Sequence, residues 1–240
     1  MSSTRGAVIF GARNLGRAVI ERLIASGWSV VGVARSDATL ELVEQLGGTA
    51  VRADVTDPAS VRGVLDDARS TFGSVDLAVN AAAAYGGERS GHFGGGPIAE
   101  ADLDGFDAWT AAPARAAFTF LSAGAGFALE QDRPMTLIQV TGGSTRRAMP
   151  GRGLWAAGSF GVRAITNAAA LELREHGIHV ALLIVDAGIE PITGDPGGRT
   201  GDAFADPRQI ASAVEFLADQ GARSATHELQ VTPLAETWVP

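Results

Sequence analysis

The stretch GAVIFGARNLGRAVIERLIASGWSVVGVAR, residues 6–35, determines the fold class of this chain. A short apolar run, Ala7 to Phe10, leads through the turn Gly11–Gly16 into an amphipathic segment of about Gly16 to Ala25. A second β-branched run, Ser29 to Ala34, follows. Short apolar runs of this kind predict strands, and apolar positions at helical spacing predict the segment between them as a helix. The order strand, helix, strand implies a crossover that leaves the two strands parallel.

The same alternation continues to the end of the chain. Further strands are predicted at Thr49 to Ala53, Leu77 to Asn80, Thr136 to Thr141, His179 to Val185 and Glu228 to Val231. Further helices are predicted at about Ala38 to Leu46, Pro58 to Phe72, Asp102 to Glu130, Leu154 to Glu175 and Pro207 to Asp219. This pattern predicts a doubly wound α/β fold, in which a seven-stranded parallel sheet lies between helices on both faces as a three-layer sandwich. No linker or repeat divides the sequence, so residues 1–240 are expected to form one domain.

The composition excludes several partners and chemistries. The chain has 240 residues, a formal net charge of −8 and a pI near 5.0, which argues against nucleic acid or an anionic membrane as a partner. It has no cysteine, which excludes disulfides, thiolate metal sites and thiol nucleophiles, and no metal site is expected. The sequence does not open on a charged leader with an apolar stretch, and no apolar run is long enough to span a bilayer. The expected location is therefore the cytoplasm.

The basic side chains are all of one kind. The 19 lysine and arginine positions are all arginine, and the single tyrosine is Tyr85. A coding bias explains the absence of lysine most simply. Whatever its cause, the absence excludes every mechanism that needs a lysine.

Glycines mark the turn after the first predicted strand. Gly11 and Gly16 would let the backbone approach a pyrophosphate, whose charge the N-terminal amides of the next helix would stabilise. Two glycines at this spacing also fit a tight turn without any ligand. Their position after the first strand of a correctly alternating chain favours the phosphate site.

Several motifs occur in the order that is typical of the short-chain dehydrogenases/reductases. They are the turn Gly11–Gly16, which resembles TGxxxGxG, Asp54-Val55 in ADVTD, Asn80-Ala-Ala-Ala, VTGGS with PGRGLW, HGIHVALL, Ala187-Gly188 and DPRQIASAVEFLAD. The resemblance covers about residues 5–232. It implies a Rossmann-type fold, a nicotinamide cofactor and a small-molecule substrate. It also implies a homodimer or homotetramer formed through the two long helices, about 102–130 and 154–175.

The chain departs from this family at the residues that carry its chemistry. The family uses an Asn-Ser-Tyr-Lys tetrad, and the resemblance places these four at Pro113, Gly142, Trp155 and Ser159. All four types are therefore replaced, and no shift of register supplies a lysine. The glycine turn is also one residue shorter and lacks the middle glycine. Loss of a positioned general acid typically lowers a rate by about 10²–10⁴.

Other side chains are candidates for a catalytic role. Asp186 follows the sixth predicted strand and is a candidate base at the nicotinamide side of the cleft. Ser144 lies two residues beyond the lost serine, while Tyr85 and His92 belong to a loop that follows the fourth strand. A solvated or capping role is the alternative for each of them, and it is the one we favour.

The end of the second strand favours NADP(H) over NAD(H). An acid at this position binds the ribose 2′-hydroxyl of NAD, whereas an arginine accommodates the 2′-phosphate of NADP. Arg35 and Ser36 stand here, Arg13 stands in the glycine turn, and Asp37 is expected to cap the next helix. The predicted cofactor-binding residues are Gly11, Arg13, Asn14, Leu15, Gly16, Arg35, Ser36, Asp54, Val55, Asn80, Gly188 and Ile189.

Three functions follow from these observations. The first is an NADP(H)-binding protein of this family whose hydride chemistry is lost or unorthodox. The second is an NADPH-dependent reductase of an activated small molecule such as a quinone, enone or imine. The third is a non-redox lyase, isomerase or cyclase in the same cleft. Two loops, about 84–101 and 187–206, are expected to form the walls of that cleft, because ligands bind beyond the carboxyl ends of parallel strands.

Overall fold

A computed structural model describes residues 4–83, 92–131, 133–192, 201 and 204–236 of the chain. Its main sheet has seven strands in the order β3-β2-β1-β4-β5-β6-β9, and all neighbouring pairs are parallel. The strands are β1 (Gly6–Phe10), β2 (Ser29–Ala34), β3 (Thr49–Arg52), β4 (Leu77–Asn80), β5 (Thr136–Gly142), β6 (His179–Val185) and β9 (Glu228–Val231). The prediction of a seven-stranded parallel sheet is confirmed.

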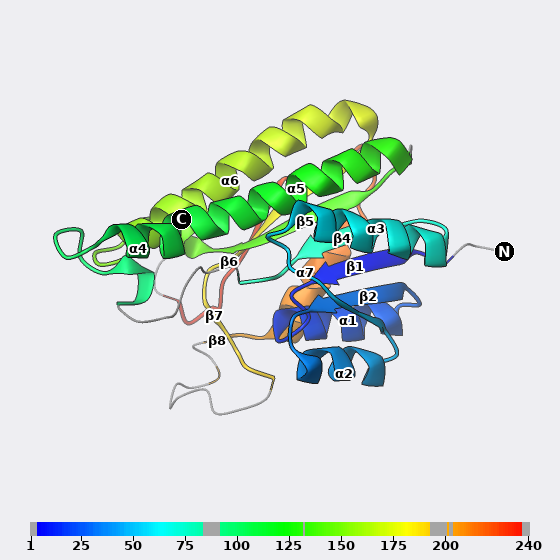
Figure 1. The fold of residues 1–240 in the computed structure, drawn as a ribbon, viewed down its shortest axis with the longest axis horizontal. Coiled ribbons are helices and arrows are strands. Elements are labelled where there is room, and N and C mark those ends of the chain that lie inside the picture. The colour runs from blue at the N-terminus through cyan, green and yellow to red at the C-terminus, as the bar shows by residue number, and fades with distance from the viewer. Residues whose placement is uncertain (1–3, 84–91, 132, 193–200, 202–203, 237–240) are drawn as a thin grey trace.

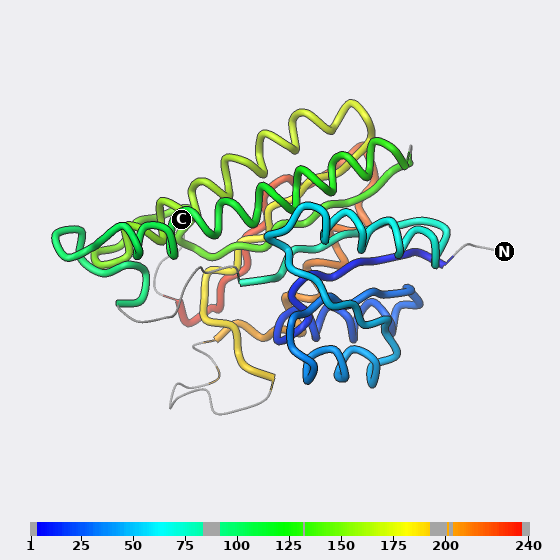
Figure 2. The backbone as a smooth tube through the Cα atoms, viewed as in Figure 1, coloured from blue at the N-terminus to red at the C-terminus, as the bar shows by residue number. Residues whose placement is uncertain are grey.

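Helices cover both faces of the sheet (Figure 1). The principal helices are α1 (Leu15–Ala25), α2 (Asp37–Gln45), α3 (Pro58–Phe72), α5 (Ala112–Gln131), α6 (Gly153–Leu173) and α7 (Pro207–Ala218). The buried side chains of α1, α2 and α7 pack on one face, and those of α3, α5 and α6 pack on the other. Figure 2 follows α5 and α6 in green and yellow-green along one side of the sheet and α1 and α2 in blue along the other. The structure is thus the three-layer sandwich that the sequence predicts.

Strand burial explains why local patterns locate these elements so well. Every residue of β1 and of β4 is buried, as are all residues of β6 after the first. A strand buried on both faces must be apolar at nearly every position, which gives a continuous signal in the sequence.

The ends of helices also have recognisable sequence signals. The Asp57 side chain accepts hydrogen bonds from the amides of Ala59 and Ser60 at the start of α3, and Gly73 ends that helix with φ +84°.

The predicted helix from Asp102 to Glu130 is wrong as a single helix. It is divided into α4 (Leu103–Phe106), a five-residue π-helix (Asp107–Ala111) and α5. Pro113 has no N–H to donate to the carbonyl of Trp109, and the wider π turn occurs at this point. Gly158 of α6 packs against that carbonyl, because a Cβ atom there would lie 2.5 Å from the Trp109 oxygen.

The predicted loops are also partly structured. Within about 187–206, β7 (Gly188–Ile189) pairs in parallel with β8 (Phe204–Ala205). Apolar runs of only two residues are too short to predict strands. Within about 84–101, a short 3₁₀ helix spans Phe93–Gly95. Among the described residues, no helix is both long and apolar enough to cross a membrane.

Candidate functional site

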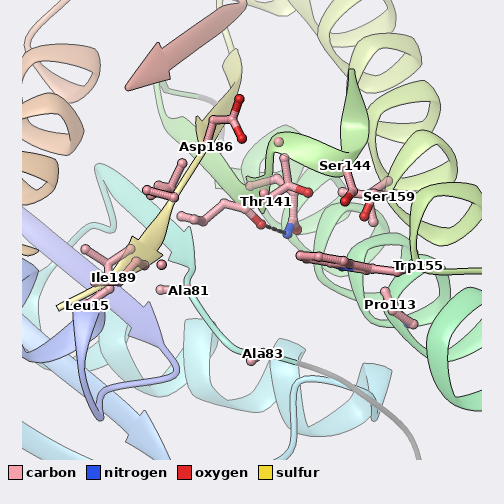
Figure 3. A pocket seen from close by; sticks show the side chains of 18 of the residues that line it. Leu15, Ala81, Ala83, Pro113, Thr141, Ser144, Trp155, Ser159, Asp186 and Ile189 are labelled. Carbon is pink, nitrogen blue, oxygen red and sulfur yellow. Dashed lines mark hydrogen bonds between the residues drawn. The ribbon is translucent and has the colours of Figure 1, made fainter. Parts of the chain in front are cut away.

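A cavity of about 520 Å³ opens where the parallel strands end. Its lining comes from the ends of β4, β5 and β6, from β7, and from the first turns of α1, α5 and α6. Leu15 and Ile189 lie at one end of this cavity, and Trp155 and Pro113 lie at the other (Figure 3). This is the edge of a parallel sheet at which ligands bind in open α/β folds.

The glycine turn is held in place by close backbone packing. Gly11 has φ +88°, and a Cβ atom there would lie 2.5 Å from the backbone nitrogen of Ala82. A Cβ atom at Gly16 would collide with the carbonyl oxygen of Gly11. The amides of Gly11 and Ala12 both donate to the carbonyl of Val33, at 3.0 and 3.1 Å. Both glycines are therefore required by the fold itself, whether or not a phosphate binds.

The amino terminus of α1 suits an anion. Its cap residue, Asn14, makes no side-chain hydrogen bond to the first amides of the helix, whereas aspartates cap α3 and α7. The side-chain amide of Asn14 instead joins the turn to the segment after β7. Nδ2 donates to the carbonyl of Glu190 at 3.1 Å, and Oδ1 accepts from the amide of Ile192 at 3.0 Å. The first amides of α1 therefore have no side-chain cap.

The side chains predicted to select NADP lie at the ends of β2 and β3, outside the cavity lining. Arg35 is 77% exposed, and its guanidinium is 3.7 Å from the carboxylate of Asp54. Ser36 shares a hydrogen bond with the hydroxyl of Thr39, 2.8 Å away. Arg13 is exposed on the glycine turn. An exposed arginine whose ion pair is this long is free to turn toward a phosphate.

Asp54 and Val55 form a turn after β3. The carboxylate of Asp54 accepts from the amide and hydroxyl of Thr56, at 2.9 and 2.8 Å. The amide of Thr56 contributes most to lowering the pKa of Asp54, and Arg35 adds to the effect. Val55 is buried in the core, so only its backbone can meet a ligand. Asp37 does not act as a cap, because it is the first residue of α2 and its carboxylate pairs with Arg52.

Asn80 is buried at the end of β4, with 1% of its surface exposed. Its Nδ2 donates to Oε1 of Gln139 at 3.0 Å, and its Oδ1 accepts from the amide of Ala82 at 3.2 Å. Gln139 belongs to β5, lines the cavity and was missed from the sequence. An amide inside an apolar strand was the available signal, because a buried polar side chain needs a partner.

The structure brings together the four positions at which the resemblance places the tetrad. Pro113, Gly142, Trp155 and Ser159 all line the cavity, although they come from three different elements. A Cβ atom at Gly142 would lie 3.5 Å from the Trp155 ring, so the two positions face each other. None of the four side chains ionises near neutral pH.

Trp155 belongs to an aromatic cluster that sequence reasoning did not find. Its ring lies edge to face with Phe93 and Trp109, at centroid distances of 4.9 and 6.3 Å. Phe93 and Trp109 also contact each other at 5.1 Å. Such edge-to-face pairs stabilise their mutual orientation. This end of the cavity is thus a fixed aromatic wall.

Three hydroxyl groups face the cavity near this wall. Thr141, Ser144 and Ser159 all line it, and none of their hydroxyls makes a hydrogen bond to another described residue. Figure 3 shows Ser144, Ser159 and Trp155 in the same part of the cavity lining. A ligand oxygen at this place can therefore accept hydrogen bonds from neutral donors.

Asp186 is held by an arginine. Its carboxylate accepts from Nη1 and Nη2 of Arg147, at 2.8 and 3.1 Å, and only 6% of its side chain is exposed. Gly143 packs directly on this carboxylate, because a Cβ atom there would collide with it. A bidentate guanidinium occupies both oxygens. Asp186 lines the cavity, as the sequence predicts, but its oxygens are engaged in the ion pair and are poorly placed to take a proton.

The remaining candidates are placed as follows. His92 is exposed, its Nε2 lies 3.9 Å from Oε2 of Glu100, and it is not among the residues that line the cavity. Tyr85 lies outside the described residues. Gly188 and Ile189 line the cavity at the end of β7. Among the residues that the structure describes, no three His, Asp or Glu side chains are grouped as metal ligands.

Comparison with known proteins identifies the family of the chain. A family model described as enoyl-(acyl carrier protein) reductase matches residues 10–188. The short-chain dehydrogenase/reductase eriH of Hericium erinaceus is 30% identical over 252 residues, which cover 94% of this chain and 95% of that protein. The chain belongs to the short-chain dehydrogenase/reductase family. This confirms the resemblance that the motifs indicate.

Other similarities are shorter or limited to the fold. The 3-oxoacyl-(acyl-carrier-protein) reductase FabG of Salmonella typhimurium is 42% identical, but only over 78 residues, or 31% of this chain and 32% of that protein. The match therefore spans about a third of the length of that relative. A metagenomic short-chain oxidoreductase solved in complex with NADP has 24% sequence identity and a TM-score of 0.74, covering 98% of this chain and 100% of that one.

Proposed function

We propose that this short-chain dehydrogenase/reductase binds NADP(H) and does not use the proton relay of its family, so that its hydride chemistry is lost or unorthodox. The observation that carries the proposal is that Pro113, Gly142, Trp155 and Ser159 line one cavity without an ionisable group among them. The cavity lies at the edge of the sheet where ligands bind in open α/β folds.

The residues present fit the cofactor. The uncapped start of α1 offers amides to the pyrophosphate, and Arg35 with Arg13 offers guanidinium groups to the 2′-phosphate. Asn80, Gly188 and Ile189 line the end of the cavity that would take the nicotinamide. When bound, the cofactor supplies or accepts a hydride. The solved NADP complex of a protein with the same fold supports this assignment.

Direct titration tests the proposal. Adding protein to NADPH should change the nicotinamide fluorescence, and the thermal midpoint of the protein should rise with NADPH concentration. NADH should give a smaller shift than NADPH at the same concentration. Absence of any fluorescence change and any thermal shift with either cofactor would contradict the proposal.

A second candidate is an NADPH-dependent reductase of an activated acceptor. The unpaired hydroxyls of Ser144 and Ser159 support it, because they can hydrogen bond to a carbonyl oxygen without transferring a proton. A quinone or enone stabilises the added negative charge by conjugation and needs less help from an acid. Measuring NADPH consumption with a panel of quinones, enones and imines tests this candidate. Sustained consumption with any of them supports it, and no consumption with all of them contradicts it.

The non-redox alternative has less support from the geometry. It relies on Asp186 as a base, and Arg147 occupies both oxygens of that carboxylate. It would require Asp186→Asn to abolish turnover while Arg35→Ala leaves turnover intact.

We also infer that two copies of the chain associate through α5 and α6. These helices pack side by side (Figure 1), and their outer faces expose Phe118, Leu129, Phe160 and Leu171. Exposed apolar side chains along two adjacent helices favour a partner. Light scattering should show Phe118→Glu with Phe160→Glu to be monomeric, while Phe216→Glu on α7 should stay at least dimeric. A wild-type monomer at micromolar concentration would contradict the inference.

A further inference from the structure

Arg152 places a guanidinium group at the aromatic end of the cavity. It immediately precedes α6, is partly buried and lines the cavity. Its guanidinium carbon lies 5.2 Å from the ring centroid of Phe93 and 5.9 Å from that of Trp155. Both rings present their faces to the cation, an arrangement that holds a guanidinium in a defined position.

The neighbouring loop is shaped around this arginine. Gly94 has φ +83°, and a Cβ atom there would lie 2.9 Å from Cγ of Arg152. Gly95 has φ +93° and packs in the same way on Leu154. An isolated bridge also pairs Gly96 with Arg152. The three consecutive glycines therefore bring the loop against the stem of Arg152 and position Phe93 beside its head.

The charge of Arg152 has no protein partner in the described part of the chain. Four ionisable side chains line the cavity, and two of them, Arg147 and Asp186, pair with each other. Glu236, from the segment after β9, is the third. Arg152 makes no ion pair with any residue that the structure describes. In a chain of net charge −8, an unmatched guanidinium inside a cleft favours an anionic ligand.

The surroundings also indicate the shape of such a ligand. Phe93 and Met149 line the cavity and are 55% and 41% exposed, so they present apolar surface without a covering group. Trp155 supplies a flat surface against which a planar group can stack. Arginine binds a carboxylate through two parallel hydrogen bonds. The site thus combines a planar apolar surface with a carboxylate-binding head.

We infer that the cleft takes a planar aromatic carboxylate, whose ring packs on Trp155 and Phe93 and whose carboxylate pairs with Arg152. The inference rests on the proposed function only in that both assign this cavity to a small-molecule ligand. It names the chemical class of that ligand, and it does not depend on the cofactor.

Calorimetric titration with naphthalene-2-carboxylate tests the inference, and naphthalene-2-carboxamide serves as the neutral control ligand. The wild-type protein should bind the carboxylate more tightly than the amide. Arg152→Gln should raise the Kd for the carboxylate by about tenfold, the effect of one lost charge-assisted pair, and leave the Kd for the amide unchanged. Arg208→Gln removes the same charge from exposed α7 and should change neither Kd.

Three outcomes would overturn the inference. They are equal affinity of the wild-type protein for both ligands, equal weakening of both by Arg152→Gln, and failure of the wild-type protein to bind the carboxylate. Equal weakening would show that Arg152 only supports the aromatic wall. A parallel NADPH titration separates this result from the proposed function. Carboxylate binding without NADPH binding would contradict the proposed function alone, and the reverse would contradict this inference alone.

Discussion

The two ends of the cleft differ in why their residues are there. At the end formed by β1 and α1, Gly11 and Gly16 touch backbone atoms at distances that admit no side chain. At the end formed by α5 and α6, Trp155 and Ser159 face open space in the cavity. Replacing the glycines would disturb the fold, whereas replacing Trp155 or Ser159 mainly changes what the cleft can bind. The presence of Gly11 and Gly16 is therefore weaker evidence for function than the identity of Trp155 and Ser159.

Introducing the four tetrad residues should produce the largest effect, a faster reduction of ketones in the cleft. The variant with Pro113→Asn, Gly142→Ser, Trp155→Tyr and Ser159→Lys should reduce an unactivated ketone such as cyclohexanone about 10²–10⁴ times faster than the wild-type protein, because it regains a positioned acid. The measurement is NADPH consumption at saturating cofactor. Trp155→Tyr alone is the control, and it should gain much less without the lysine. Equal rates for wild type and the full variant would contradict the view that the four replaced residues limit this reaction.

Breaking the Arg147–Asp186 pair should lower stability more than any surface change. Asp186→Asn should reduce the free energy of unfolding by about 3 kcal/mol, because it removes the charge of a carboxylate that is buried in a bidentate ion pair. Urea unfolding measures the change. Asp219→Asn breaks the exposed Arg5–Asp219 pair, whose side chains are 45% and 50% exposed, and should cost less than about 1 kcal/mol. Equal losses would mean that the cavity pair is no stronger than a surface pair.

Replacing Arg35 tests the part of the site that is proposed to bind the nucleotide. Arg35→Ala should raise the Kd for NADPH by about tenfold and leave the Kd for NADH nearly unchanged, because only NADPH carries the 2′-phosphate. Fluorescence titration with each cofactor gives both constants. Arg22→Ala on α1, which pairs with Glu215, is the matched control and should change neither. If Arg35→Ala weakened both cofactors equally, the arginine would not discriminate between them.

A carboxylate next to the cleft should produce a pH-dependent stability. Glu228 of β9 accepts from Arg163 at 2.6 and 2.8 Å and from Asn167 at 3.0 Å, and the Arg163 hydrogen bonds contribute most to lowering the pKa of Glu228. Because its folded pKa is depressed, the stabilisation is present above the ordinary glutamate pKa of about 4.3 and is lost as the pH falls through the folded value.

Unfolding experiments across pH measure that dependence. Glu228→Gln should be less stable than wild type by about 1 kcal/mol at neutral pH, and the difference should shrink below about pH 4. Glu44→Gln, at an exposed position of α2, is the control and should show no such convergence. A difference that stays constant with pH would assign the effect to packing rather than to charge.

The smallest effect is expected from removing the contact that Asn14 makes between the glycine turn and the segment after β7. Asn14→Gly removes two hydrogen bonds to the segment after β7. The amide of Ile192 should then exchange with deuterium about fivefold faster, the equivalent of about 1 kcal/mol in local opening. Exchange in β1, far from this contact, should not change. Unchanged exchange at Ile192 would mean that the segment is held by β7 and β8 alone.

Local patterns located most of the fold and some of the site. The strands are predicted to within about one residue because two-sided burial makes them continuously apolar. The cavity positions Gly142 and Trp155 follow from alignment with the family's motifs. The π-helix before α5 and the β7–β8 pair were missed, because they depend on one missing N–H group and on contact between segments distant in the sequence.

The sequence by itself determined the order of the elements and the absence of lysine. These depend on residue identity and on spacings of two to four residues. The tertiary structure alone decided which side chains meet. Arg147 reaches Asp186 and Arg152 reaches Phe93 only because strand ends and loops distant in the sequence converge at one edge of the sheet. Periodicity carries no information on such pairs, so the charge and shape of the cleft had to be taken from the structure.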